Sequence, residues 1–344
     1  MISLKLRFVF IIVLFTSAIF AQRYENLVFE GGGIRGIAYC GALETLQKEN
    51  KLADLKRVAG TSVGAIQATM VAINYNAEEM ATIISDLNLK NFNDGRLIFF
   101  GGSHRLWNNY GWYRGDKLLN WIGELIEKKT GNAEITFRQL HDLVSDKGFK
   151  DLYVTGTNLS KQASETFSYE NYPDMKIKDA VRISVSVPLY YRAVFMDSLH
   201  NITYKPKKNI DYEIFVDGGI LQNFPIHIFD STKYIDPNAD TSRYQFNPGT
   251  LGIRLDSRDQ IEHDLQQKKG LAPFKITGFK SYTSAFYNII IENLNRTNLT
   301  SNDWKRTISI DTERIGPRVK KLSSANKDIL IESGKTGARA FLSH

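Results

Sequence analysis

Cysteine is almost absent from this chain of 344 residues, which contains only Cys40. A single cysteine cannot form an internal disulfide, so cysteine usage does not identify the redox compartment of the protein. Cys40 lies within the apolar stretch IAYCGAL. That context favours a small buried residue over a reactive thiol.

Metal-binding motifs are missing as well. The sequence contains no D-x-D-x-D-G loop, no H-E-x-x-H helix and no cluster of cysteines. We therefore expect chemistry that uses no metal and no other cofactor. The six histidines share no motif either: His104, His141, His200, His227, His263 and His344.

Nucleic-acid-binding motifs are also absent, although the formal net charge is +7. A mildly basic surface suits anionic lipid head groups, at about 1 kcal/mol per suitably placed charge. The alternative is that the charge serves solubility alone. We therefore expect no nucleic-acid partner and a peripheral contact with membrane surfaces.

The N-terminus has the features of a targeting segment. An apolar run from Phe8 to Phe20 follows Lys5 and Arg7, and the stretch AIFAQ then offers Ala21 as a cleavage residue. This pattern predicts a secretory signal peptide over residues 1–21 and export to the periplasm, the cell surface or the medium. An uncleaved anchor is the alternative, although the run is shorter than the roughly 20 apolar residues that a membrane span needs.

No repeat, low-complexity tract or Pro/Ser-rich linker divides the rest of the chain, so we expect one domain over residues 22–344. Helical and strand-like patterns alternate along it, which predicts an α/β fold with a sheet between layers of helices. The helical patterns cover Ala77–Leu87, Gly115–Lys128, Thr136–Val144 and Phe274–Leu294, and the strand-like runs cover Asp151–Thr157, Tyr212–Val216, Leu251–Leu255 and Arg306–Asp311.

The stretch LVFEGGGIRGIAYCGALETL, from Leu27 to Leu46, has glycines where a strand gives way to a helix. Leu27 to Phe29 is typical of a short buried parallel strand, and apolar residues recur at helical spacing from Ile37. The turn from Gly31 to Gly36 would present unpaired N–H groups at the positive end of a helix dipole. Such a turn suits an anion, either a phosphate or a transient oxyanion.

The phosphate interpretation rests on Gly31, Gly33 and Gly36, which match G-x-G-x-x-G after a strand. A dinucleotide site also needs an acidic residue about 20 positions later, at the end of the second strand. Asp54 has that spacing but precedes the next strand, RVAG. This weakens the nucleotide interpretation.

The strand RVAG runs into GTSVG, which is G-x-S-x-G followed by an apolar helix-forming run. This is the context of a nucleophile elbow, with Ser62 at a sharp turn flanked by the small residues that the turn requires. A serine that only caps a helix is the alternative. If the two glycine-rich junctions share one sheet edge, one turn would carry the nucleophile and the other the oxyanion hole. The elbow positions beside Ser62 are Gly60, Thr61, Val63 and Gly64.

A nucleophilic serine needs a base. Asp217 ends a β-rich run and precedes Gly218 and Gly219, which let the backbone approach a partner closely. Burial would raise the pKa of such a carboxylate, and a hydrogen bond to the serine would align it for proton transfer. An Asp-Gly turn is the alternative. His227 suits a Ser-Asp-His order, but its apolar neighbours favour a core histidine.

In combination, these blocks resemble the patatin-like phospholipases, which use a serine-aspartate dyad. The resemblance rests on GGGIRG, GTSVG and DGG in that order, with RISVSVPLYYRAV between the serine and the aspartate. It implies a three-layer sandwich with a mostly parallel central sheet. It also implies Ser62 as nucleophile and Asp217 as base. The implied oxyanion hole comprises Gly31, Gly32, Gly33, Ile34, Arg35 and Gly36, with the amides of Gly32, Gly33 and Ile34 as donors.

The function that follows is an exported lipid acyl hydrolase of the phospholipase A or lysophospholipase type, acting on phospholipid or other lipid esters. Ser62 would attack the ester and form an acyl-enzyme, which water activated by Asp217 would hydrolyse. Two alternatives stay open. One is a serine hydrolase of another class, such as a thioesterase or peptidase, and the other is a non-catalytic nucleotide or membrane binder.

One further stretch, over residues 97–115, combines aromatic residues with glycines and has no clear period. Its glycines would permit movement over the site, and its aromatic side chains would suit a lipid interface. Alternatively, those side chains cover the core. The aromatic residues in question are Trp107, Tyr110, Trp112 and Tyr113.

Overall fold

The computed structural model describes residues 23–343, except 96–99, 237, 240–241, 267, 269, 280, 283–284, 287–288, 290–295, 297–298, 314 and 317–321. The predicted signal peptide over residues 1–21 and His344 lie outside the described residues. Among the helices that the structure describes, none is long and apolar enough to cross a membrane.

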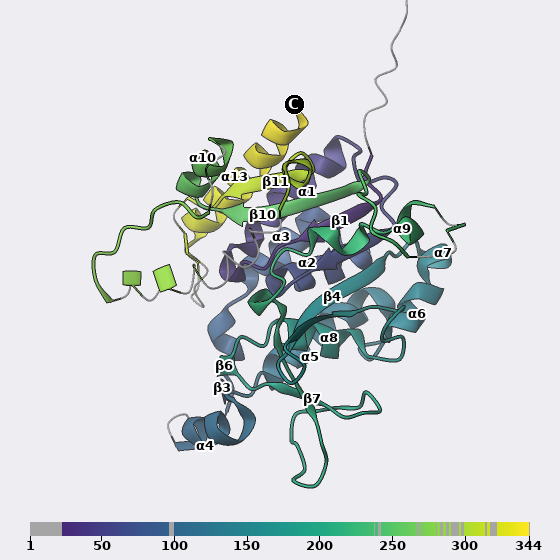
Figure 1. Ribbon diagram of the computed structural model, residues 1–344, viewed down its shortest axis with the longest axis vertical. Helices are drawn as coiled ribbons and strands as arrows, with labels where there is room; N and C mark the ends of the chain where they lie inside the picture. The colour runs from purple at the N-terminus through teal and green to yellow at the C-terminus, as the bar shows by residue number, and fades with distance from the viewer. Residues whose placement is uncertain are drawn as a thin grey trace, which may run out of the picture.

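A nine-stranded sheet forms the centre of the molecule (Figure 1). Its strands follow the order β11-β10-β1-β2-β4-β9-β7-β8, with β5 paired to β4. The pairs from β11 to β4 are parallel, and the remaining pairs are antiparallel. The strands are β1 (Asn26–Phe29), β2 (Arg57–Gly60), β4 (Asp151–Asn158), β5 (Ala163–Phe167), β7 (Val194–Met196), β8 (Ile202–Thr203), β9 (Glu213–Asp217), β10 (Thr250–Asp256) and β11 (Thr307–Asp311).

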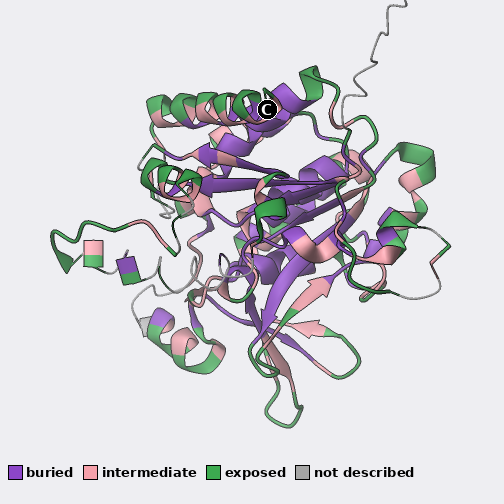
Figure 2. Ribbon diagram, turned by 45° about the horizontal axis from the view of Figure 1, so that its top comes forward, coloured by how far each residue is buried: buried purple, intermediate pink, exposed green. Residues whose placement is uncertain are grey.

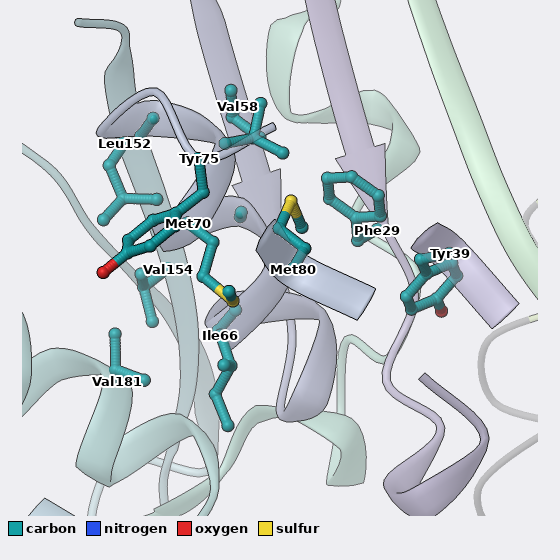
Figure 3. Close-up of a cluster of buried hydrophobic side chains, with 14 of the residues drawn as sticks. Phe29, Tyr39, Val58, Ile66, Met70, Tyr75, Met80, Leu152, Val154 and Val181 are labelled. Atoms are coloured by element: carbon teal, nitrogen blue, oxygen red, sulfur yellow. The ribbon is translucent and has the colours of Figure 1, made fainter. Parts of the chain in front are cut away.

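Side-chain alternation along the parallel strands produces a core on each face of the sheet. Leu27 and Phe29 of β1 belong to a large cluster on one face, whereas Val28 belongs to a small cluster on the other. Adjacent residues of a strand point to opposite faces, so short apolar runs such as LVF supply both cores. Figure 2 shows the buried strands in the interior, and Figure 3 shows part of the large cluster.

Most helices pack over the large cluster. Contacts join α1 to α13 and α3, α2 to β2 and β4, and α8 to β4 and α5. The opposite face is covered by shorter elements, including η4, whose residues join the small cluster. The elements are η1 (Gly33–Ile37), α1 (Ala38–Lys48), α2 (Val63–Ala72), α3 (Ala77–Asp86), η2 (Leu89–Phe92), α5 (Asp116–Thr130), α6 (Phe137–Asp142), α7 (Val144–Lys147), α8 (Ile177–Ser184), η3 (Gly218–Ile220), η4 (Ile226–Phe229), α9 (Thr232–Ile235), α10 (Arg258–Leu265), α12 (Ser301–Trp304) and α13 (Ser324–Leu342).

The described part of the stretch over 97–115 is more regular than the sequence suggested. Helix α4 (Phe100–Asn109) is followed by β3 (Gly111–Tyr113), which pairs in parallel with β6 (Leu189–Tyr191) in a separate two-stranded sheet. Trp107 is 83% exposed, whereas Trp112 is partly buried. A Cβ added to Gly102 would lie 2.6 Å from the Trp112 ring. The indole can therefore pack against α4 only because residue 102 has no side chain.

One predicted helix is divided in the structure, and another is described only in part. The helix predicted over Thr136–Val144 divides at Leu143 into α6 and α7. The helix predicted over Phe274–Leu294 lies partly outside the described residues, and within it residues 279, 281, 282, 285, 286 and 289 are helical.

Candidate active site

Ser62 occupies the turn between β2 and α2, with φ 54° and ψ −124°. A side chain in this backbone region is strained, and such strain persists only where the surroundings enforce it. Glycines on both sides of Ser62 let the backbone pack this closely. A Cβ on Gly60 would lie 2.2 Å from the Gly64 carbonyl oxygen, and a Cβ on Gly64 would lie 2.5 Å from the Glu30 carbonyl oxygen. GTSVG thus forms a sharp strand-to-helix turn with Ser62 at its apex.

Asp217 lies at the end of β9 and accepts a hydrogen bond of 2.8 Å from the Ser62 hydroxyl at Oδ2. Its other oxygen, Oδ1, accepts from the Gly219 amide at 2.8 Å. A Cβ on Gly218 would meet the Thr155 carbonyl oxygen at 2.6 Å, so the acidic turn depends on its glycines. The structure thus joins two residues that are far apart in the sequence in the orientation that proton transfer requires.

The electrostatic setting of Asp217 matches that of a base that works near neutral pH. Burial raises the pKa of its carboxyl group to about 7, and the hydrogen bonds from Gly219 and Ser62 limit the rise. A carboxylate in water has a pKa near 4 and is a weak base. Burial of Asp217, which is 6% exposed, thus moves its pKa into the range where general bases are most effective.

The glycine turn lies beside the nucleophile. A Cβ on Gly31 would lie 3.3 Å from the Ser62 Cβ, and one on Gly36 would lie 2.6 Å from the Val63 side chain. Both turns meet because β1 and β2 are parallel neighbours, with Phe29 opposite Gly60 at their carboxyl ends. Gly33 has φ 57°, a left-handed conformation that glycine adopts without strain.

Three backbone amides of this turn are candidate hydrogen-bond donors to an oxyanion. Within the described chain, the N–H groups of Gly32, Gly33 and Ile34 donate to no protein oxygen. Amides of this kind at the start of a helix stabilise an oxyanion. The Arg35 side chain turns back on the loop, where Nε donates to the Gly32 carbonyl oxygen at 3.1 Å.

Sequence reasoning missed several residues that hold the two turns together. The Ser62 amide donates to the Ser184 hydroxyl at 2.8 Å, and Thr61 Oγ1 donates to the Gln222 carbonyl oxygen at 2.9 Å. Asn223 Nδ2 donates to the Gly31 carbonyl oxygen at 3.1 Å. Ser184 belongs to the block RISVSVP and Asn223 follows DGG closely, so only proximity to a motif would have pointed to them.

The block RISVSVP also carries a fully buried arginine, Arg182. Its guanidinium donates to the carbonyl oxygens of Gly115 at 3.1 Å and Arg114 at 2.9 Å. Two residues beyond Ser184, the Ser186 carbonyl oxygen accepts from the Asp217 amide at 3.0 Å. The block therefore supports both members of the Ser62–Asp217 pair and fixes the segment that precedes α5.

In the described part of the chain, no histidine is hydrogen bonded to Ser62 or Asp217. His227 instead pairs through Nε2 with Asp303 at 2.9 Å. His141 Nδ1 lies 2.7 Å from Asp151 Oδ1.

His227, Asp230 and Asp303 lie close enough together to hold a metal ion, and the sequence did not suggest this group. Arg306 already bonds both carboxylates, at 2.6 Å from Nη2 to Asp230 Oδ2 and 2.6 Å from Nη2 to Asp303 Oδ1. Burial opposes ionisation of Asp303, but hydrogen bonds from His227, Thr300 and Arg306 outweigh it and lower its pKa to about 2. The cluster is therefore an ion-pair network in which Arg306 bridges the two carboxylates.

The fold does not place Asp54 where a dinucleotide site would need its acidic residue. Asp54 precedes β2, at the amino end of the strand, and pairs with Arg23 at 3.5 Å on the surface. The glycine turn lies at the carboxyl end of the neighbouring strand. Asp54 thus lies at the wrong edge of the sheet for a ribose held near Gly31.

This chain is similar to several known proteins. A family model described as patatin-like phospholipase matches residues 27–230. An uncharacterized protein of Acanthamoeba polyphaga mimivirus is 31% identical over 236 residues, covering 68% of this chain and 71% of the relative. A probable lipid hydrolase of Invertebrate iridescent virus 6 is 28% identical over 207 residues, covering 60% and 63% of the two chains.

Among solved structures, VipD from Legionella pneumophila is similar to this chain, with a TM-score of 0.56. The match covers 93% of this chain and 67% of VipD at 16% sequence identity. At that identity the likeness concerns the fold. It agrees with the α/β architecture and mostly parallel sheet that the sequence predicted.

Proposed function

This chain belongs to the patatin-like phospholipase family of lipid ester hydrolases, and on that premise we propose that it is an exported lipid acyl hydrolase with a Ser62–Asp217 dyad. The observation that carries the dyad is the hydrogen bond of 2.8 Å from Ser62 Oγ to Asp217 Oδ2. Its substrates are phospholipid or other lipid esters.

Acylation begins when Ser62 Oγ attacks the ester carbonyl carbon while Asp217 Oδ2 accepts the hydroxyl proton. The carbonyl oxygen gains negative charge, which the amides of Gly32, Gly33 and Ile34 stabilise. Each such donor is worth about 3–4 kcal/mol in a preorganised site. Asp217 then returns the proton to the alkoxide of the leaving lipid, and the C–O bond breaks.

Deacylation repeats these steps with water. Asp217 accepts a proton from the water molecule as its oxygen attacks the acyl carbon, and the same amides stabilise the second oxyanion. The proton returns to Ser62 Oγ as the fatty acid leaves. One carboxylate thus serves as base and acid in both halves of the reaction, which requires a pKa near working pH.

Export is a separate part of the proposal and rests on the N-terminal pattern alone. A signal peptidase cut after Ala21 would leave Gln22 as the first residue. N-terminal sequencing of the protein recovered from outside the cytoplasm tests this. A sequence starting at Gln22 supports it, and recovery of an intact N-terminus would favour a retained anchor.

Two assays test the enzymatic proposal. A fluorophosphonate should label the wild-type chain and fail to label Ser62→Ala, because the probe reacts with activated serines. Incubation with a mixed lipid extract should then release free fatty acids. The probe could label the chain while no lipid releases fatty acid. If the chain then turns over thioesters or peptides, it belongs to another class of serine hydrolase.

A further inference from the structure

One segment combines positive charge with exposed apolar side chains. From Gln266 to Arg296 the sequence contains Lys268, Lys269, Lys275 and Lys280 and a single acidic residue, Glu292. Six large apolar residues in this segment are at least half exposed, and Phe279 is 82% exposed. These six, together with the exposed Lys268 and Lys275, are called the basic apolar surface below: Phe274, Ile276, Phe279, Tyr282, Phe286 and Ile289.

The exposed side chains share one face of a helix. Phe279, Tyr282, Phe286 and Ile289 are helical and follow each other at intervals of three or four residues, which places them on one side. Ala285 is buried at 7% exposure. The large apolar side chains of this helix are therefore exposed, whereas the apolar side of an ordinary surface helix faces the core.

Polar contacts fix both ends of this segment near the carboxyl end of β10. The Ala272 amide donates to Gln260 Oε1 at 2.8 Å, and Arg296 pairs with Asp256 and with Asp264 of α10. Strand β10 is the parallel neighbour of β1, which leads into the glycine turn. In Figure 1, α10 and the segment after it extend on the left, at the edge toward which β10 runs.

We propose that the basic apolar surface docks this chain on an anionic lipid bilayer, an inference that rests on the proposed lipid hydrolase function. Aromatic and branched side chains would enter the boundary between head groups and acyl chains, while lysines contact anionic head groups. Docking there would bring the bilayer to the sheet edge that carries Ser62. The site would then face the phase in which its substrate resides.

The charge of the segment favours a bilayer over a second copy of this chain. A symmetric dimer would place two identical surfaces against each other. The charged side chains of each surface are lysines, Lys268 and Lys275. Like charges brought together in this way repel, whereas an anionic bilayer supplies the missing opposite charge.

Binding is measured by cosedimentation of the full chain carrying Ser62→Ala, so that the lipid is not consumed. The vesicles contain phosphatidylcholine with or without phosphatidylserine. We expect stronger binding to vesicles with phosphatidylserine and weaker binding at high salt, since salt screens exposed charges. Equal binding to both compositions at all salt concentrations would overturn the anionic part of the proposal.

The test variant is Phe279→Ser with Phe286→Ser, and the matched control is Leu199→Ser with Tyr244→Ser. The control side chains are 81% and 72% exposed but lie outside the segment. The test pair should weaken binding to phosphatidylserine vesicles by roughly tenfold or more, because two inserted rings are lost. The control pair should leave binding unchanged. Equal binding by both pairs would overturn the proposal.

Activity assays distinguish a failure of the docking proposal from a failure of the hydrolase proposal. In the chain that retains Ser62, the Phe279/Phe286 variant should hydrolyse a soluble short-chain ester at the wild-type rate and vesicle lipid more slowly. If the wild-type chain does not hydrolyse the soluble ester, that result instead refutes the hydrolase proposal. Light scattering could show that the wild-type chain is a dimer and that the Phe279/Phe286 variant is a monomer. The surface would then be a subunit interface, and the docking proposal would be wrong.

Discussion

Asn223 and Gly31 are hydrogen bonded in both directions. The Gly31 amide donates to the Asn223 carbonyl oxygen at 3.0 Å, and Asn223 Nδ2 donates to the Gly31 carbonyl oxygen at 3.1 Å. Asn223 follows the turn that carries Asp217, and Gly31 begins the turn that holds the candidate oxyanion donors. These bonds therefore join the segment that follows Asp217 to the glycine turn.

Asn223→Ala should lower kcat for a soluble ester by about tenfold to a hundredfold, because misplaced oxyanion donors stabilise the transition state less. KM should change little. The matched control is Asn171→Ala, which removes an exposed amide that donates to the Thr166 carbonyl oxygen at 3.2 Å. If both variants keep wild-type kcat, Asn223 does not position the oxyanion hole.

The rate of ester hydrolysis should depend on the ionisation of Asp217. The base must be a carboxylate, and burial raises its pKa to about 7. In the free enzyme, kcat/KM should therefore rise with pH and reach half its plateau near pH 7. A plateau that already extends down to pH 5 would show that the working carboxyl group has an ordinary pKa.

The same pKa predicts how stability depends on pH. Between pH 4 and 7 the folded chain holds a proton on Asp217 that the unfolded chain, with a carboxyl pKa of 3.8, has released. The folded state binds more protons, so this group makes the free energy of unfolding fall as pH rises. Asp217→Asn should therefore melt at a higher temperature than wild type at pH 8, with the difference shrinking toward pH 4. A constant difference across this range would contradict the raised pKa.

The backbone of Ser62 stores strain that glycine would relieve. At φ 54° and ψ −124°, alanine is as strained as serine, whereas glycine is not. Ser62→Gly should therefore be more stable than Ser62→Ala by roughly 1 kcal/mol or more, and both variants should be inactive. Thermal melts of the two variants measure this. Equal melting temperatures would mean that the elbow is not strained in solution.

The parts of the site that the sequence predicted are those with strong local signals. Glycines at Gly60 and Gly64 are needed wherever a strand turns sharply into a helix, so GTSVG indicated the elbow without tertiary information. Asp217 was predicted in the same way, from a β-rich run that ends in Asp-Gly-Gly. Parallel pairing then brings two such turns to one edge, which is a general property of α/β sheets.

The parts that the sequence did not reveal depend on contacts between distant segments. Ser184 is hydrogen bonded to Ser62 and Asn223 to Gly31, and no local pattern distinguishes these two residues from other polar residues. The antiparallel strands β5, β7 and β8 contain only two to five residues, and β5 (ASETF) also lacks the apolar run of a buried parallel strand. Helix α4 contains two glycines, which lower helix propensity and hid it.

The most direct test of the dyad compares ester hydrolysis by Ser62→Ala, Asp217→Asn, their double variant and His227→Gln, each shown to be folded by a thermal melt. We expect each single dyad variant to lose nearly all turnover. The double variant should be little worse, since members of one catalytic unit are strongly non-additive. His227→Gln should keep most activity, because His227 pairs with Asp303. A folded Asp217→Asn with wild-type turnover, together with loss of activity in His227→Gln or His263→Gln, would contradict the dyad and indicate a Ser-Asp-His hydrolase.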